Sequence, residues 1–241
     1  MKTKLTIAAL ILAAAVLSPA NAAPILLTAS LTPSASGNPL DINLTGSYSG
    51  DYIVATGYDG GLTGTVPPTT SSSVTIPNTS GDKTAVGVNS SGTSLGLASD
   101  SDEIGYNKTG GNDYVVLDFS DHAATAGSPA QAGSSVSFGL NVDVKEATAG
   151  GSYWVIYGFT TDNGTGTPTL LASGEMKATG VVPTITTAFY SSYVIGILGD
   201  CEINITGISA TYGTPEPGTF MMGGLALIGF GIAMKKRIRK A

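Results

Sequence analysis

The sequence predicts an all-β fold for the body of this 241-residue chain, an antiparallel β-sandwich of the jelly-roll kind. Three observations lead to this prediction. Short apolar segments alternate with polar residues at period two, and no part of the body sustains the 3.6-residue period of an amphipathic helix. Gly, Ser and Thr are abundant between these segments and supply turns. About 190 residues suffice for one domain with one core.

Residues 1–22 have the features of a secretory signal peptide. Two lysines lie among the first four residues, and the apolar run Leu5–Leu17 is short for a membrane span. Ala20 and Ala22 give the small-x-small pattern that signal peptidase recognises, so we expect cleavage before Ala23. The alternative is an uncleaved N-terminal anchor. The exported body would then extend from residue 23 to residue 214.

The clearest predicted strand runs from Val136 to Val144, where apolar residues alternate regularly with Ser, Gly, Asn and Asp. This pattern places one face of the strand in a core and the other in water. Enrichment in Val, Ile, Tyr and Phe predicts further strands at Asp113–Phe119, Ser152–Thr160, Tyr193–Leu198 and Glu202–Tyr212. Turn residues at Thr161–Pro168 predict a loop between two of them.

In the last predicted strand, Glu202–Tyr212, the apolar residues switch from odd-numbered to even-numbered positions part of the way along. Ile203 and Ile205 share one parity, whereas Ile208 and Ala210 share the other. Gly207 lies at the change, and an extra residue in a β-bulge would produce this pattern.

The segment from Ala23 to Gly81 has weaker strand signals, at Ile25–Leu31 and Tyr52–Thr56, and several prolines. Thr63–Ser80 is predicted to be a long loop. We expect this segment to add edge strands to the same sandwich rather than to form a second domain.

Residues 218–234 form an uncharged apolar run near the lower length limit, roughly 17 residues, for a helix that crosses a membrane. The glycines in this run are tolerated in membrane helices. A basic cluster follows and would hold the C-terminus in the cytoplasm by the positive-inside rule, leaving the body outside. The cluster consists of Lys235, Lys236, Arg237, Arg239 and Lys240.

Pro215, Glu216 and Pro217 immediately precede this apolar run. A Pro-Glu-Pro tripeptide, an apolar span and a basic end, in this order at residues 215–241, resemble the PEP-CTERM sorting signal. The resemblance implies a precursor anchored in the inner membrane, processing by exosortase, and delivery to the cell surface or an extracellular polysaccharide matrix. The order of segments in the body is also similar to the sandwich bodies common among PEP-CTERM proteins. A plain C-terminal anchor is the alternative.

The body carries a strong negative charge. Between residues 23 and 214 there are four lysines, no arginine and sixteen acidic residues, a net charge of −12. Such a body repels phosphate backbones, so nucleic acid is excluded as a partner. It would also repel acidic polysaccharide unless a cation intervened. Cys201 is the only cysteine, which precludes an internal disulfide. We expect it to be a small buried residue, with dimerisation through its thiol as the alternative.

Asp100, Asp102 and Glu103 form the most suggestive cluster of ligating residues. Grouped carboxylate oxygens on a loop suit Ca²⁺, which takes six to eight oxygen ligands in flexible geometry. The spacing does not match an EF-hand. The alternative is a solvated acidic loop. With one His and one Cys, the chain alone cannot assemble a three- or four-ligand N/S zinc site.

Signals for other chemistry are weak. Ser94 lies in a G-x-S-x-G match, but that motif needs a strand, a sharp turn and a helix, and no helical pattern follows. His122, the only histidine, is predicted to be solvated, and Trp154 to be a core residue. The sequence therefore favours a non-enzymatic exported protein of the cell surface or matrix, associated with extracellular polysaccharide. The alternatives are a carbohydrate-binding module, with Tyr48, Tyr52, Tyr58 and Tyr106 as sugar platforms, and a secreted hydrolase.

Overall fold

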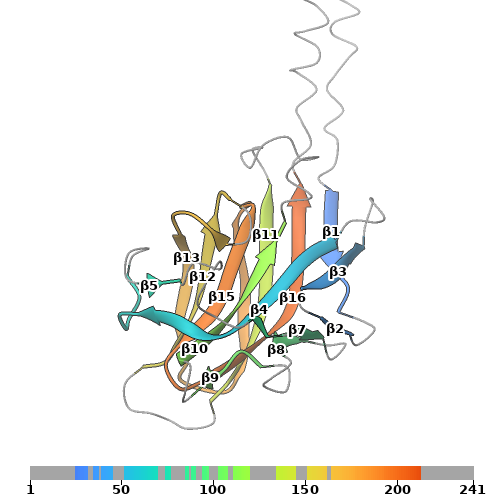
Figure 1. The fold of residues 1–241 in the computed structure, drawn as a ribbon. Coiled ribbons are helices and arrows are strands. Elements are labelled where there is room, and N and C mark those ends of the chain that lie inside the picture. Colours follow the sequence, from blue (N-terminus) through green and yellow to red (C-terminus); the bar gives the residue numbers. More distant parts are fainter. Residues whose placement is uncertain are drawn as a thin grey trace, which may run out of the picture. The chain divides into compact units, whose positions relative to one another are not determined.

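The computed structural model describes most of the residues between Ile25 and Tyr212 (Figure 1). The described residues are 25–31, 35–37, 39–45, 52–69, 74–76, 85–86, 88–90, 94–97, 103–107, 111–119, 134–144, 151–161 and 164–212. They contain strands and no α-helix, and all pairings are antiparallel. The prediction of an antiparallel all-β fold is therefore confirmed. The predicted signal peptide and C-terminal span lie outside the described residues.

The described residues form sixteen strands, which differ widely in length. They are β1 (Ile25–Ala29), β2 (Ala35–Gly37), β3 (Leu40–Thr45), β4 (Tyr52–Gly64), β5 (Val74–Thr75), β6 (Ala85–Val86), β7 (Val88–Ser90), β8 (Leu95–Leu97), β9 (Tyr106–Asn107), β10 (Gly111–Asp118), β11 (Ser135–Asp143), β12 (Tyr153–Phe159), β13 (Thr169–Glu175), β14 (Gly180–Ala188), β15 (Ser192–Leu198) and β16 (Glu202–Tyr212).

The strands form two facing sheets that are joined at one corner. The first sheet follows the order β14-β11-β16-β1, with the short strands β8, β7 and β2 continuing beside β16. The second sheet follows the order β13-β12-β15-β10-β4. β3 belongs to both, because Leu40–Asn43 pair with β4 whereas Leu44 and Thr45 pair with β1. The arrangement is therefore closer to an open barrel than to two separate layers.

The N-terminal segment joins this fold, as expected. The prediction that it supplies edge strands holds for the short β2, which ends the strand order, but not for the longer β1 and β4. β1 lies between β3 and β16, and β4 lies between β3 and β10. β3, which was not predicted, lies between them and alternates in burial, with Leu40, Ile42 and Leu44 in the core. The predicted long loop Thr63–Ser80 is shorter than expected, because β4 continues to Gly64 and pairs there with β5.

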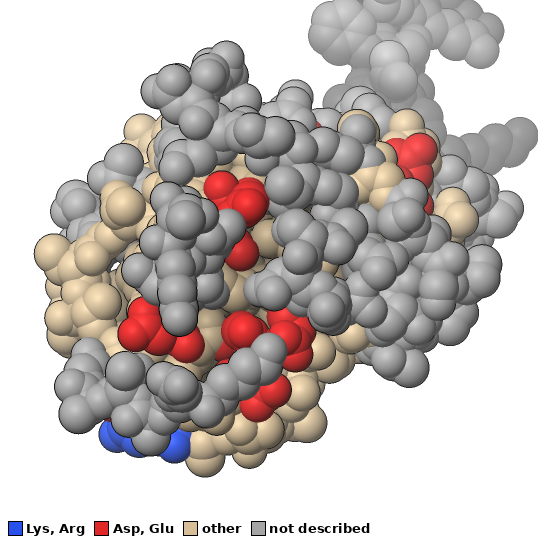
Figure 2. Space-filling view, turned by 60° about the horizontal axis from the view of Figure 1, so that its bottom comes forward, with Lys and Arg blue, Asp and Glu red and all other residues tan. Residues whose placement is uncertain are grey.

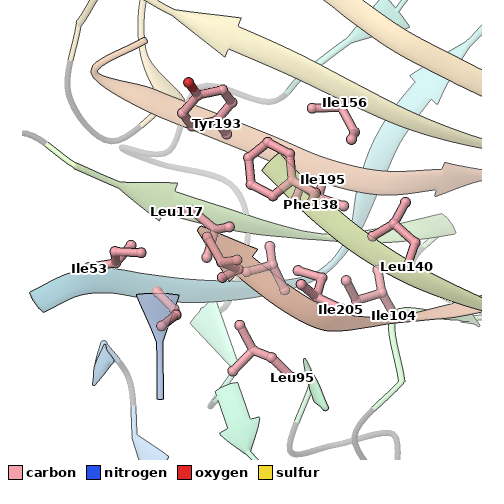
Figure 3. Packing of buried hydrophobic residues seen from close by; sticks show 14 of the residues in the cluster. Ile53, Leu95, Ile104, Leu117, Phe138, Leu140, Ile156, Tyr193, Ile195 and Ile205 are labelled. Carbon is pink, nitrogen blue, oxygen red and sulfur yellow. The ribbon is translucent and has the colours of Figure 1, made fainter. Parts of the chain in front are cut away.

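The main core fills the space between the two sheets. Phe138 from β11 contacts Tyr193 from β15 edge to face, with ring centroids 5.0 Å apart, and Phe119 contacts Tyr193 at 5.3 Å in the same manner. Figure 3 shows that residues from both sheets point into this space. They include Ile53, Leu95, Ile104, Leu117, Phe138, Leu140, Ile156, Tyr193, Ile195 and Ile205.

A second apolar cluster lies on the opposite face of the β4-β10-β15-β12 sheet. Successive residues of β10, β12 and β15 are buried, so these strands have a covered outer face as well as a core face. Gly164 and Leu170 help to cover it: a Cβ added to Gly164 would lie 3.1 Å from Val194. The cluster consists of Tyr58, Leu62, Tyr114, Val116, Val155, Tyr157, Phe159, Val194 and Leu198.

The bulge predicted near Gly207 is present. Gly139 of β11 pairs with Gly207 of β16, but the next residue, Leu140, pairs with Ile205. Thr206 is therefore the extra residue of β16. Ile203, Ile205, Ile208 and Ala210 are consequently all buried, although they differ in parity.

Candidate metal centre

Three carboxylates converge where the sheet containing β11 and β16 ends. Asp143 is the last residue of β11 and pairs directly with Glu202, the first residue of β16. Glu103 reaches the same place through a separate short contact, in which Ile104 pairs with Ile203. This contact is a two-way backbone ladder, with Ile104 N donating to Ile203 O at 2.6 Å and Ile203 N donating to Ile104 O at 3.0 Å.

Alternation along the strands determines which way these side chains point. Val142, Ile203 and Ile104 are 4%, 1% and 0% exposed and belong to the core. Their neighbours Asp143, Glu202 and Glu103 therefore project from the opposite face, because successive residues of a strand point to opposite sides. All three are half-buried.

One carboxylate oxygen from each of the three residues lies within 4.8 Å of the other two. Ca²⁺ binds oxygens at about 2.3–2.6 Å, so two ligands on opposite sides of one ion are roughly 5 Å apart. The spacing of the three oxygens is therefore compatible with a single Ca²⁺ among them. Three carboxylates this close without a cation would repel one another.

The surrounding polar side chains also carry oxygen atoms of the kind that coordinate cations. Asn204 is two residues after Glu202 on the same face of β16, and the Ile104–Ile203 pairing places it opposite Glu103. Asn141 lies across from Asn204 on β11. Thr179 orients Asp143, since its hydroxyl donates to Asp143 Oδ1 at 3.2 Å and accepts from Val144 N at 3.0 Å.

Among the described residues, acidic side chains predominate at this end of the fold. Figure 2 shows acidic side chains gathered over the central part of this face, with basic atoms at one rim. Within the described residues the only basic side chain other than histidine is Lys177. Its ammonium lies 2.8 Å from Glu175, and the hydrogen bond and charge of that carboxylate raise the pKa of Lys177.

The predicted acidic cluster, Asp100, Asp102 and Glu103, overlaps this carboxylate group at one residue. Glu103 is a member of the carboxylate group, whereas Asp100 and Asp102 lie outside the described residues. Glu103 O accepts a hydrogen bond from Leu97 N at 3.1 Å, so residues 98–102 connect two paired positions. The sequence analysis did not single out Asp143 and Glu202, the other two members of the group. Their sequence signal is slight: each is the charged terminal residue of a regular strand.

The other predicted site residues have ordinary structural surroundings. Trp154 and Cys201 are 8% and 2% exposed, as expected for core residues. Ser94, 9% exposed, precedes the strand β8 instead of the helix that a nucleophile elbow requires. Tyr58 is 8% exposed and stacks on Tyr114, which leaves little of its ring for a sugar. His122, Tyr48 and the side chain of Tyr106 lie outside the described residues.

The described residues form an all-β body with acidic side chains at one end. The sequence continues beyond this body into the C-terminal segment 215–241. A family model, the PEP-CTERM protein-sorting motif, matches residues 214–237. The chain is therefore an exported protein that carries the PEP-CTERM signal for exosortase-dependent sorting to the cell envelope or surface. Among curated proteins, none matches this chain.

The sorting residues themselves are outside the described part of the chain. These are the Pro215–Pro217 tripeptide, the apolar run 218–234 and the basic cluster that follows. Within the part that is described, no helix is long and apolar enough to cross a membrane.

Proposed function

We propose that this protein is a non-enzymatic component of the cell surface or extracellular matrix, and that its body associates with neutral polysaccharide. The observation that carries the proposal is the sorting motif at residues 214–237, which accounts for delivery outside the cell. The outer face of the first sheet supports the second half of the proposal, because it offers a regular array of hydroxyl groups.

One row of this array crosses five strands. Antiparallel pairing aligns Ser137 with both Thr186 and Ser209, and aligns Thr28 with both Ser209 and Thr45. Thr28, Thr45 and Thr186 are exposed, whereas Ser137 and Ser209 are half-buried. We name these five residues the hydroxyl row: Thr45, Thr28, Ser209, Ser137 and Thr186.

The hydroxyl row has the chemistry to bind a sugar polymer. Neighbouring strands are ~4.8 Å apart, so the row presents a donor and acceptor at this interval over about 19 Å. The Ser137 and Thr186 hydroxyls are already 2.9 Å apart and hydrogen-bonded, which fixes their rotamers. The net charge of −12 favours a neutral polymer over an acidic one.

The test is retention of the full-length protein on polysaccharide isolated from the producing cells. Ser137→Lys together with Thr186→Lys would remove two hydroxyls and lay long side chains over the row. We expect this double variant to elute early. Ser173→Lys, at an exposed position on β13 of the other sheet, is the matched control and should be retained like the wild type. Retention of the double variant at the wild-type level would contradict the proposal.

The enzyme alternative has a separate test. A serine-directed activity probe should leave Ser94 unlabelled in the folded protein, since the residue precedes a strand in a sheet and is 9% exposed. Labelling of Ser94 that disappears on denaturation would favour the hydrolase instead.

A further inference from the structure

We propose that Glu103, Asp143 and Glu202 form a Ca²⁺ site, with Asn204 as a fourth ligand, and that Ca²⁺ locks three separate segments of the chain together. Glu103 immediately precedes Ile104, Asp143 ends β11 and Glu202 begins β16. At this end of the sheet, only a few backbone hydrogen bonds among the described residues hold these segments to one another. An ion bound by all three carboxylates would add a further link between the segments.

Asn204 provides an observation that is independent of the acidic residues. Its Oδ1 atom is buried and, among the described residues, accepts no hydrogen bond. A buried amide oxygen without a partner is costly, and coordination to a cation is one way to satisfy it. The strand register places Asn204 beside Glu202 on the same face and opposite Glu103. An amide oxygen is a common Ca²⁺ ligand alongside carboxylates.

The donor set selects a hard cation. Every candidate ligand is an oxygen, and the nearby Cys201 is on the core side and 2% exposed. Oxygen-only sites suit Ca²⁺ and Mg²⁺ rather than zinc or copper. Mg²⁺ needs near-ideal octahedral geometry at about 2.0–2.1 Å, whereas Ca²⁺ accepts the wider and less regular spacing of side chains that project from three separate segments. Three carboxylates also supply more charge than a divalent ion needs, which favours binding over mere screening.

The test compares thermal unfolding of the full-length protein, purified in detergent, in chelator and in Ca²⁺. In chelator, Glu202→Gln should unfold at the wild-type temperature or above it, because the substitution relieves repulsion among the carboxylates and keeps the side-chain shape. In millimolar Ca²⁺ the order should reverse, with the wild type gaining several degrees and the variant little. Asp143→Asn should behave in the same way. Asp41→Asn removes the same charge from an exposed position on β3 and should retain the full Ca²⁺ response.

Two substitutions of Asn204 test whether this residue is a Ca²⁺ ligand. Asn204→Leu should weaken Ca²⁺ binding about tenfold or more by isothermal titration, whereas Asn204→Asp, which keeps an oxygen, should bind at least as tightly as the wild type. Equal shifts with Ca²⁺, Mg²⁺ and NaCl of matched ionic strength would reduce the effect to screening and overturn the proposal. A Ca²⁺ response that survives in both Glu202→Gln and Asp143→Asn would also overturn it. Neither result bears on the hydroxyl row, whose binding is measured separately.

Discussion

Tyr58 of β4 and Tyr114 of β10 are directly paired across the sheet and stack face to face, with ring centroids 4.9 Å apart and an interplanar angle of 13°. Both rings are buried in the second apolar cluster, where they are 8% and 1% exposed. Burial raises the pKa of Tyr58, and burial together with the charge of ionised Tyr58 raises the pKa of Tyr114.

This pair predicts a loss of stability at alkaline pH. The tyrosines of the unfolded chain ionise near pH 10, whereas the raised pKa keeps those of the folded chain neutral to higher pH. Above about pH 10 the unfolded state therefore binds fewer protons, and the free energy of unfolding falls by up to ~1.4 kcal/mol per pH unit for each tyrosine. Below pH 10 the tyrosine pair should not make the free energy of unfolding depend on pH.

Urea unfolding at pH 8, 10 and 11 measures this effect. Tyr114→Phe keeps the stacked ring and removes the ionisable group, so its alkaline slope should be shallower than that of the wild type. An identical slope in both proteins would show that other groups cause the alkaline instability.

Two glycines form a matched test of packing. A Cβ added to Gly196 would lie 2.7 Å from Leu62 Cδ2, 2.8 Å from Tyr114 Cβ and 2.9 Å from a backbone oxygen, whereas one added to Gly207 meets nothing within 4 Å. We expect Gly196→Ala to lower the free energy of unfolding by ~1–3 kcal/mol or more and Gly207→Ala to change it by less than about 0.5 kcal/mol. Urea denaturation measures both. Equal effects would mean that the sheet adapts to the methyl group at Gly196.

The N-terminal processing site gives a third prediction. The exported protein should begin at Ala23, because the small residues Ala20 and Ala22 follow a short apolar core. Intact mass or N-terminal sequencing of the exported species checks this. If that species still begins at Met1, the segment is an uncleaved anchor.

Several strands could be predicted because their sequences carry one clear period. The alternation of β11 reflects one core face and one half-buried outer face, and β16 was predicted with its bulge because the parity of its isoleucines changes at Gly207. β13 and β14 could not be predicted in this way. Each is an outermost strand of its sheet and has no fully buried face, and Pro183 lies within the second. The nearly continuous burial of β10, β12 and β15 depends on the second cluster, which forms only when distant segments cover them.

The candidate metal centre was predictable only in part for a similar reason. Glu103 belongs to an acidic run that is visible in the sequence. Asp143 and Glu202 are separated from it by 40 and 99 residues, and their convergence depends on the register of β11 with β16 and on the bridge between Ile104 and Ile203. Strand register is a property of the whole sheet, so the residues alone could not specify which acids would meet.

Sorting of this protein through its C-terminus can be tested by the intact mass of the mature protein from a host that contains exosortase. We expect a mass that lacks residues 218–241. Replacement of Pro215, Glu216 and Pro217 by alanine should leave a full-length, membrane-bound form, because the sorting enzyme loses its recognition sequence. Release of the alanine variant at the wild-type rate and with the wild-type mass would mean that another protease, and not exosortase, releases the protein.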